Sequence, residues 1–511
     1  MSYQCQTSSC NSIGPNGPGT GEGTYGYYRY RVLGTIGKAS SNNQAIFFQD
    51  NWRVNKRLSI NAGLRSEREF VPGFNTTGVQ TTAILFNWPK KMSPRVGVAI
   101  DPKGDGKSVF RAGFMYAYDI MKYSLPRGSF GGDVWKEYFY TLDDPNVVNT
   151  NQGYAANPTA LPGKLIETVD YRIPSSDPSQ HLIDPNLMPM KDRVIDAAYE
   201  YSISPSLVAS VRFTDRRLIH TIEDIGYQTP NGETYNIGNP GFGTVANPAN
   251  WLAWDGPGVP TTPKAVRNYD AGEFRLDKRL SKSYQFSFSY TLSRLYGNYS
   301  GLASSDESGD TPNGAGRASP DNTRYFDQPW IFGDSHGHIV NGLLGTDRPH
   351  TFKLLGGYSL HSFLGSTTFS PSIQAFSGTP LTSEVQLIDT QGWVYYNGRG
   401  DLGRTPFYFN TDFQVAHDFK PIHERVNVRF EFTIFNLLNS DTATNYYTLY
   451  SHINDGQINL PSNFTLGDLF SQGIDVKALM KAQNIRVDPQ YDQKDTFQGP
   501  RNMRLHLAIR F

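Results

Sequence analysis

The segment GDSHGH places three potential metal ligands, Asp334, His336 and His338, within five residues. On a strand, two imidazoles spaced by two would share one face, and with a carboxylate they could hold a metal ion. The neighbouring glycines instead indicate a loop, and no further paired ligands occur nearby. We therefore interpret the histidines as incidental loop residues and predict no metal site.

A glycine-rich segment matches the dinucleotide-binding pattern G-x-G-x-x-G at Gly21, Gly23 and Gly26. The match follows no strand and leads into YYRYRV rather than into a helix. A phosphate would therefore find no helix N-terminus to bind. We interpret the segment as a flexible loop.

Acidic residues and cysteines carry equally little evidence for chemistry. Asp306, Glu307 and Asp310 could bind calcium, but their spacing is not that of an EF-hand, and a solvated acidic loop is favoured.

Cys5 and Cys10 lie in a leader rich in Gly, Ser and Asn, where they could form a local disulfide or remain free thiols. No Ser, His and Asp set and no Cys and His set has a spacing that argues for nucleophilic catalysis. We therefore predict no enzyme activity, no catalytic residues and no cofactor.

The composition favours strands and turns. Charged residues make up 18% of the 511 residues and aromatic residues 13%, and the chain contains 49 Gly and 32 Pro. Lys plus Arg and Asp plus Glu both number 47, so the chain has no net charge that would favour nucleic acid as a partner. The mean hydropathy is −0.48 and no stretch approaches the length of a transmembrane helix, but both properties are compatible with membrane-spanning strands.

Strict alternation of apolar and polar residues recurs along the chain. In KSYQFSFSYTLSR, Tyr284, Phe286 and Phe288 alternate with Gln285 and Ser287. Similar ribbons occur at 57–65, 110–118 and 425–434. Each has the length that a tilted strand needs to cross a bilayer.

Short and long connections alternate between these ribbons. Short turns are predicted at 54–57, 101–107, 204–206, 281–282, 361–366 and 420–423. Long polar stretches are predicted at about 70–93, 120–190, 217–263, 296–349, 379–403 and 437–500. This is typical of an outer-membrane barrel with short periplasmic turns and long extracellular loops, whereas a soluble β-sandwich, the alternative, has no reason to sort its connections in this way.

The strand count indicates an all-β, antiparallel transmembrane barrel. Thirteen strands are predicted between about residue 44 and Phe511, and a further strand at 24–34 makes fourteen, an even number that allows an antiparallel sheet to close. We assign residues 1–23 to a flexible leader and residues 24–511 to the barrel.

Several segments resemble the barrel of TonB-dependent outer-membrane receptors, particularly the Oar-like branch. They are AIFFQDNWRVNKRLSINAGLRSE (45–67), SPRVGVAIDPKGDGKSVFRAGFMYAYD (93–119), TDRPHTFKLLGGYSL (346–360), SGTPLT (377–382), LGRTPFYFNTDFQVAHDF (402–419) and RFEFTIFNLLNS (429–440). The resemblance spans most of residues 24–511. It implies a 22-stranded barrel that is plugged by an N-terminal domain and energised through TonB.

The resemblance also defines the expected function and partners. The chain has no recognisable signal peptide, TonB box or plug and is about eight strands short. It is therefore either the C-terminal barrel part of a longer receptor, which we expect, or a decayed or truncated copy. The expected function is TonB-dependent transport of a bulky, unidentified solute across the bacterial outer membrane. The expected partners are outer-membrane lipid, the TonB complex through the missing part, the barrel-assembly machinery and that solute. A surface-adhesion or structural protein and a passive porin-like channel are the alternatives.

Arginines on the polar face are possible contacts for the plug or a solute. Arg111, Arg425 and Arg429 could face plug or solute, or could pair with neighbouring carboxylates such as Glu431. No ligand-binding residue is assigned.

The final segment RNMRLHLAIRF is predicted to be the closing strand. Leu505, Leu507, Ile509 and Phe511 occupy alternate positions and should face lipid. A terminal aromatic residue on such a strand resembles the signal that the barrel-assembly machinery reads. These four residues are the predicted assembly signal.

Overall fold

The computed structural model describes most of the chain. The described residues are 2–3, 23–73, 82–121, 133–149, 159–170, 183–229, 232–243, 258–300, 324–326, 329–387, 393–420, 426–451, 455, 458–461 and 463–510. They divide into two compact units. The first contains residues 1–44, 68–87 and 121–182, and the second contains residues 45–67, 88–120 and 183–511.

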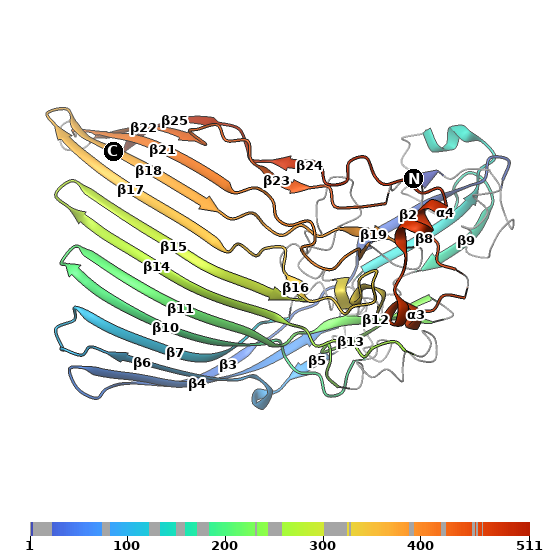
Figure 1. The fold of residues 1–511 in the computed structure, drawn as a ribbon, viewed down its shortest axis with the longest axis horizontal. Coiled ribbons are helices and arrows are strands. Elements are labelled where there is room, and N and C mark those ends of the chain that lie inside the picture. Colours follow the sequence, from blue (N-terminus) through green and yellow to red (C-terminus); the bar gives the residue numbers. More distant parts are fainter. Residues whose placement is uncertain are drawn as a thin grey trace. The chain divides into compact units, whose positions relative to one another are not determined.

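A continuous path of thirteen strands forms the main sheet (Figure 1). Each strand neighbours the strands that precede and follow it along this path, and the pairings with a defined register are antiparallel. In chain order the strands are β3 (Gln44–Arg53), β4 (Leu58–Pro72), β6 (Met92–Ile100), β7 (Ser108–Tyr118), β10 (Lys191–Ser204), β11 (Leu207–His220), β14 (Arg267–Ser281), β15 (Tyr284–Gly297), β17 (His350–Ser362), β18 (Gly365–Phe376), β21 (Tyr408–Phe419), β22 (Asn427–Phe435) and β25 (Asn502–Arg510). The prediction of thirteen antiparallel strands from about residue 44 onward is therefore confirmed.

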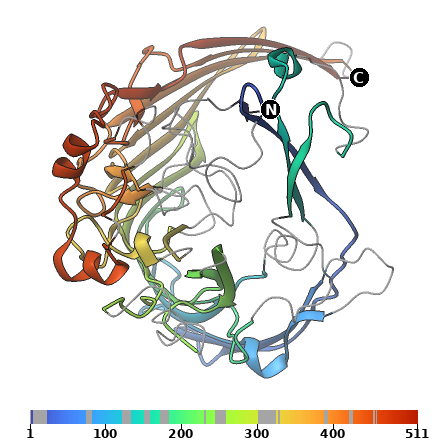
Figure 2. The same cartoon turned by 90° about the vertical axis from the view of Figure 1, so that its right-hand side faces the viewer.

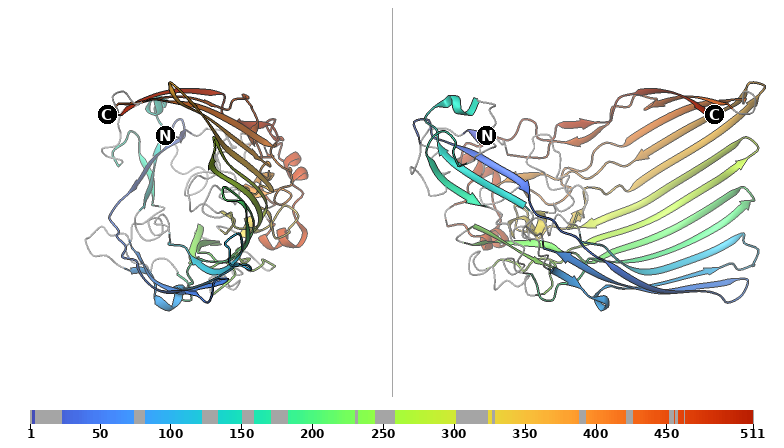
Figure 3. Two further views of the ribbon diagram at one scale, coloured as in Figure 1. Left: turned by 90° about the vertical axis from the view of Figure 1, so that its left-hand side faces the viewer. Right: turned by 180° about the vertical axis from the view of Figure 1, so that it is seen from behind.

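The alternation of short and long connections is confirmed as well. Short turns join β3 to β4, β6 to β7, β10 to β11, β14 to β15, β17 to β18 and β21 to β22, within a few residues of the predicted positions. Because the strands are antiparallel, all six turns lie at one end of the sheet, together with the end of β25 (Figure 3). We call this the short-turn end and the opposite one the long-connection end.

The two faces of the main sheet differ in polarity. Leu505, Leu507 and Ile509 lie opposite Phe432, Phe430 and Val428 and are 67%, 61% and 51% exposed. Large apolar side chains are similarly exposed at Val211, Phe213, Phe274, Leu292 and Tyr358. An exposed apolar band of this extent is unfavourable in water and favours contact with lipid. Phe511 lies outside the described residues.

The predicted strand at 24–34 forms as part of a separate four-stranded sheet. β2 (Tyr27–Thr35) pairs with β8 (Asp133–Thr141), in a sheet that also contains β1 (Ser2–Tyr3) and β9 (Leu165–Asp170). The buried Glu137 carboxylate on β8 accepts hydrogen bonds from Arg29 at 3.1 Å and Arg31 at 2.6 Å. These ion pairs stabilise the pairing of β2 with β8. Among the described residues, the continuous path of the main sheet therefore holds thirteen strands, and not the fourteen expected.

Short elements occupy the long connections. They are η1 (Trp88–Lys91), η2 (Pro145–Asn149), η6 (Arg324–Phe326), η7 (Pro329–Phe332), β5 (Thr82–Phe86), β12 (Glu223–Thr229), β13 (Gly232–Gly238), β16 (Gly342–Leu343), β19 (Glu384–Gln386), β20 (Trp393–Tyr395), β23 (Ala443–Tyr446), β24 (Lys494–Phe497), α3 (Leu466–Gln472) and α4 (Val476–Ala482). Figure 2 shows the long-connection end of the second unit, with α3 and α4 in red. Among the described residues, no helix is long and apolar enough to cross a membrane.

The helices were not foreseen in the loop expected at 437–500, although their caps are visible in the sequence. Thr465 accepts a hydrogen bond from the backbone N–H of Asp468, whose carboxylate accepts one from the backbone N–H of Thr465. This reciprocal capping box starts α3. Asp475 caps α4 by accepting from the backbone N–H of Ala478 at 2.9 Å.

The short turn before β18 provides a test of the hairpin geometry. Gly365 has a φ of 144°, and a Cβ there would lie 2.0 Å from the backbone oxygen of Asp418. We expect Gly365→Ala to lower the free energy of unfolding by about 1–3 kcal/mol. Gly272→Ala is the control, because no atom lies within 4 Å of its added methyl group. Urea unfolding of the two variants in detergent measures the difference, and equal midpoints would contradict this geometry.

Candidate functional site

Arginine–carboxylate pairs run along the polar face of the main sheet. Arg429 Nε lies 2.6 Å from Glu431 Oε1 and its Nη1 lies 3.1 Å from Asp418 Oδ2. Arg111 Nη2 lies 3.2 Å from Glu200 Oε2. The alternative that these arginines pair with neighbouring carboxylates is therefore confirmed for Arg111 and Arg429, while Arg425 lies outside the described residues.

The same pattern extends across the sheet. Further pairs on this face are Arg65 with Glu67, Arg216 with Asp192, and Arg275 with Asp277. The pairs are partly exposed, so each stabilises the fold by at most about 1 kcal/mol. Their joint effect is a polar surface that carries both signs of charge.

A cavity of about 460 Å³ opens on the polar face near the long-connection end. Its polar lining includes Asp192, Arg216, Arg267 and Tyr269, which come from β10, β11 and β14. Tyr299, just beyond β15, completes one wall, and burial raises the pKa of its phenol well above the ordinary value. The phenol is therefore neutral at physiological pH. The cavity can hold a polar solute through charged and neutral hydrogen-bonding groups.

Three of the sequence segments that resemble the receptor family meet beside the long-connection end. Asp347 is 1% exposed, and its carboxylate pairs with Arg404 and accepts a hydrogen bond from the backbone N–H of Leu295 at 2.5 Å. Arg404 Nη1 also donates to the backbone oxygens of Asp347 and Gly378, both at 3.0 Å. Thr405 binds Thr379 through a backbone hydrogen bond of 2.9 Å. We call Asp347, Gly378, Thr379, Arg404 and Thr405 the clasp.

The clasp fixes the bases of two long connections, the one between β15 and β17 and the one between β18 and β21. Its segments precede β17, follow β18 and precede β21, so strands that are sequential neighbours in the sheet are also tied together beyond their ends. Sequence reasoning recognised the segments but did not foresee the ion pair, because Asp347 and Arg404 are 57 residues apart.

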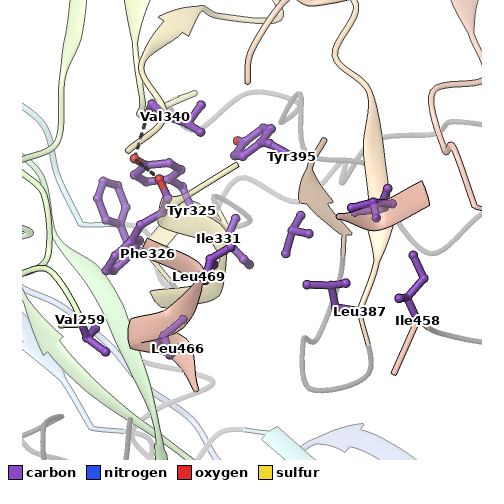
Figure 4. Close-up of a cluster of buried hydrophobic side chains, with 14 of the residues drawn as sticks. Val259, Tyr325, Phe326, Ile331, Val340, Leu387, Tyr395, Ile458, Leu466 and Leu469 are labelled. Atoms are coloured by element: carbon purple, nitrogen blue, oxygen red, sulfur yellow. Dashed lines mark hydrogen bonds between the residues drawn. The ribbon is translucent and has the colours of Figure 1, made fainter. Parts of the chain in front are cut away.

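The long connections of the second unit share a hydrophobic cluster (Figure 4). Tyr325 lies at its centre, fully buried, and its hydroxyl donates toward the backbone oxygens of Phe332 at 3.2 Å and Val340 at 2.9 Å. Leu466 and Leu469 of α3 and Ile458 pack in the same cluster. Burial, together with the neighbouring Tyr450, raises the pKa of Tyr396 at its margin to about 12. These connections are therefore packed structures of their own.

The histidine segment has a structural role in its loop. Asp334 Oδ1 accepts hydrogen bonds from the backbone N–H groups of His336 at 2.9 Å and His338 at 3.1 Å. The His338 side chain is 79% exposed, 3.7 Å from the Asp334 carboxylate. Across the described residues, no group of three or more His, Cys, Asp or Glu could hold a metal ion.

The remaining candidate motifs are placed only in part. Gly23 and Gly26 form a tight turn through reciprocal backbone hydrogen bonds of 2.8 and 3.1 Å. Gly21 lies outside the described residues, as do Asp306, Glu307, Asp310, Cys5 and Cys10.

The fold and the two-faced sheet define a membrane β-barrel protein. Residues 23–392 match the model of the outer membrane beta barrel domain, and the chain belongs to that family. It is accordingly a protein of the bacterial outer membrane, with its apolar face toward lipid. The short-turn end is then periplasmic and the long-connection end extracellular.

The similarity to Oar-like receptors is confirmed by a relative. The chain is 25% identical over 435 residues to the TonB-dependent transporter Oar of Myxococcus xanthus, a match that covers 81% of this chain and 37% of the relative. This chain therefore spans little more than a third of that relative's length.

Solved receptors show a more distant similarity. The ferripyoverdine receptor of Pseudomonas aeruginosa has a TM-score of 0.43 at 10% identity, covering 92% of this chain and 38% of the receptor. The ferric yersiniabactin uptake receptor FyuA of Yersinia pestis has a TM-score of 0.40 at 9% identity, covering 86% and 44%.

The ion pair of the clasp can be tested by removing its cation. Arg404→Gln leaves the buried Asp347 carboxylate without its charged partner, which should cost about 3–5 kcal/mol of folding free energy. The matched control is Arg275→Gln, because Arg275 and Asp277 form an exposed pair on the polar face of the main sheet and its loss should cost at most about 1 kcal/mol.

Urea midpoints in detergent, combined with limited proteolysis of the long connections, measure both effects. Equal stability of the two variants would show that the clasp does not secure the connections.

Proposed function

We propose that this chain is the C-terminal barrel part of a receptor that transports a bulky solute across the outer membrane with energy supplied through TonB. The observation that carries the proposal is the similarity to the Oar transporter over 435 residues. The alternating connections and the two-faced sheet support it, because they supply a lipid-facing wall and an extracellular rim. We also propose that residues 24–511 together form this barrel part.

The polar face has properties that suit a transport pathway. Paired arginines and carboxylates present hydrogen-bonding groups without a large field of one sign, so a polar solute can pass without being held tightly. The extracellular cavity, with Asp192, Arg216 and Arg267, is our candidate for first contact with the solute.

The alternative functions use the same barrel differently. A passive porin-like channel would conduct solutes without energy, and a surface-adhesion protein would act through its extracellular connections. The adhesion alternative would use the tryptophans of the long connections, which are Trp251, Trp254, Trp330 and Trp393. Trp251 and Trp254 lie outside the described residues. The similarity to a transporter favours transport over both alternatives.

Uptake by cells that express the full-length protein separates these functions. We expect at least one class of labelled solute among iron chelates, cobalamin, saccharides and peptides to enter only when both the full-length protein and TonB are present. Empty-vector cells and cells without TonB are the controls. Equal uptake with and without TonB would contradict active transport and favour a passive channel, while no uptake in any class would favour adhesion.

The last strand is proposed to direct assembly. Leu505, Leu507 and Ile509 form an apolar row on β25, and we propose that this row and Phe511 are recognised by the barrel-assembly machinery. Deletion of Phe511 from the full-length protein should lower its folded yield in the outer membrane several-fold. Heat-modifiable migration on gels measures the folded fraction. The matched control is Arg510→Gln, which keeps the terminal aromatic residue, and an unchanged yield after the deletion would refute the role of Phe511.

A further inference from the structure

The ladder between β17 and β18 is interrupted near the middle of both strands, which lie side by side in Figure 1. Five pairs on the extracellular side end with Leu355 opposite Ser372, and five on the periplasmic side begin with Tyr358 opposite Phe369. Two residues lie between these pairs on each strand, so the register is kept and the interruption is a gap, not a β-bulge. The four described residues in the gap, which we call the seam, are Gly356, Gly357, Ser370 and Pro371.

A proline in the interior of β18 explains the gap. Proline has no N–H group, so Pro371 cannot donate a hydrogen bond to a neighbouring strand. The N–H of Ser359 points to β15, where it donates to Ser283 at 2.7 Å, so the backbone groups of Gly356, three residues earlier, point to β18. The Gly356 carbonyl therefore faces Pro371 and lacks its ladder donor. The next pair along has no hydrogen bonds of its own in an antiparallel ladder, so it is left unsupported as well.

The gap is limited to this one ladder. The pairing of β15 with β17 runs through Gly356 and Gly357 without a break, and the pairing of β18 with β21 runs through Ser370 and Pro371. Each strand is therefore held to its other neighbour at the depth of the seam. Opening of the seam would not detach either strand from the main sheet.

The two sides of the seam differ in what covers them. Gly356 lies on the apolar face, where a Cβ would lie 3.0 Å from Cγ of Pro371, so the proline ring occupies the space of a side chain and closes the seam toward lipid. Gly357 lies on the polar face opposite Gln285, and a Cβ there would lie 3.3 Å from the Gln285 side chain. Water on the polar face can therefore hydrogen-bond the Gly356 carbonyl, which lipid cannot do.

The two halves of the β17–β18 hairpin are attached to different parts of the molecule. At the extracellular end, the Ser377 N–H donates to the backbone oxygen of His350 at 2.8 Å, and Arg348 Nη1 donates to the backbone oxygen of Ser377 at 2.7 Å. Arg348 and Ser377 adjoin Asp347 and Gly378 of the clasp. At the periplasmic end, the hairpin closes in its short turn. The seam separates the half that carries the long connections from the half that carries the turn.

We infer that the seam is a point of independent opening in the barrel wall. The extracellular half of the β17–β18 hairpin opens and closes with the long connections that the clasp ties to it, while the periplasmic half stays paired. The missing hydrogen bond lowers the free energy of local opening, and two glycines let the backbone of β17 adopt new dihedral angles at that point. This inference concerns the wall itself and does not rest on the proposed transport.

Hydrogen exchange of the full-length protein in lipid nanodiscs, read by mass spectrometry, tests the inference. After correction for intrinsic rates, peptides within residues 352–360 and 367–375 should exchange roughly tenfold faster than residues 286–292 of β15, whose pairs with both neighbours are unbroken. Peptides on the extracellular side of the seam should exchange faster than those on its periplasmic side.

Replacement of the proline should close the seam. Pro371→Ala supplies the missing N–H, so exchange on both strands should slow roughly tenfold, the change that one restored hydrogen bond makes in an opening equilibrium. Pro371→Ser supplies the same N–H and serves if the alanine variant folds poorly.

Pro94→Ala is the matched control. Pro94 also lies in a strand of the main sheet, β6, but the ladder from β4 runs through it without a gap. Its replacement should leave exchange in β17 and β18 unchanged.

Three results would overturn the inference. Unchanged exchange after replacement of Pro371 would show that the seam does not open. Equal slowing of β17 and β18 by Pro94→Ala would assign the effect to proline removal in general. Equal exchange on both sides of the seam would show that the hairpin opens as one unit.

Discussion

The fold depends on one constraint, which is that backbone hydrogen bonds inside a lipid layer must be satisfied between strands. Thirteen neighbouring strands meet this requirement in the main sheet, and their register keeps every second side chain on the same face. A slip of one residue would exchange the two faces. The exposed row at Leu505, Leu507 and Ile509 and the paired row at Arg429 and Glu431 are therefore consequences of the same register.

Much of the sheet can be predicted from the sequence because its information is local. Alternation over some ten residues identifies a strand such as β15, and the segment DPKGDGK marks the turn between β6 and β7 by its glycines and its flanking strands. What alternation cannot supply is the partner. Residues 27–35 alternate like the other predicted strands, but they pair with β8. Glu137 on β8 binds Arg29 and Arg31. Because Glu137 lies about one hundred residues away in the sequence, local alternation gives no sign of this pairing.

The candidate site is less predictable for the same reason. The polar face follows from strand parity, so the placement of Arg111 and Arg429 could be foreseen, and Glu431 could be named as a partner because it lies two residues away. The cavity combines Asp192, Arg216 and Arg267 from three strands. The clasp joins Asp347 to Arg404, which are separated in the sequence by the β17–β18 hairpin and most of the long connection to β21. The segments that form the clasp resemble the receptor family in sequence, but neither their meeting nor the buried ion pair that joins them was predicted. The helices of the last connection were missed although the Thr465 and Asp468 capping box is legible in the sequence.

The central claim is that the two faces of the main sheet meet lipid and water, respectively. Nitroxide labels at single cysteines along residues 208–213 of β11, in full-length protein carrying Cys5→Ser and Cys10→Ser in a bilayer, test it directly. The two sets of labels lie on opposite faces of the sheet. Oxygen dissolved in the lipid should therefore accelerate the spin relaxation of labels at Ala209, Val211 and Phe213. A water-soluble nickel chelate should accelerate that of labels at Val208, Ser210 and Arg212. Labels that respond alike at both sets, or that follow a helical period, would contradict the account.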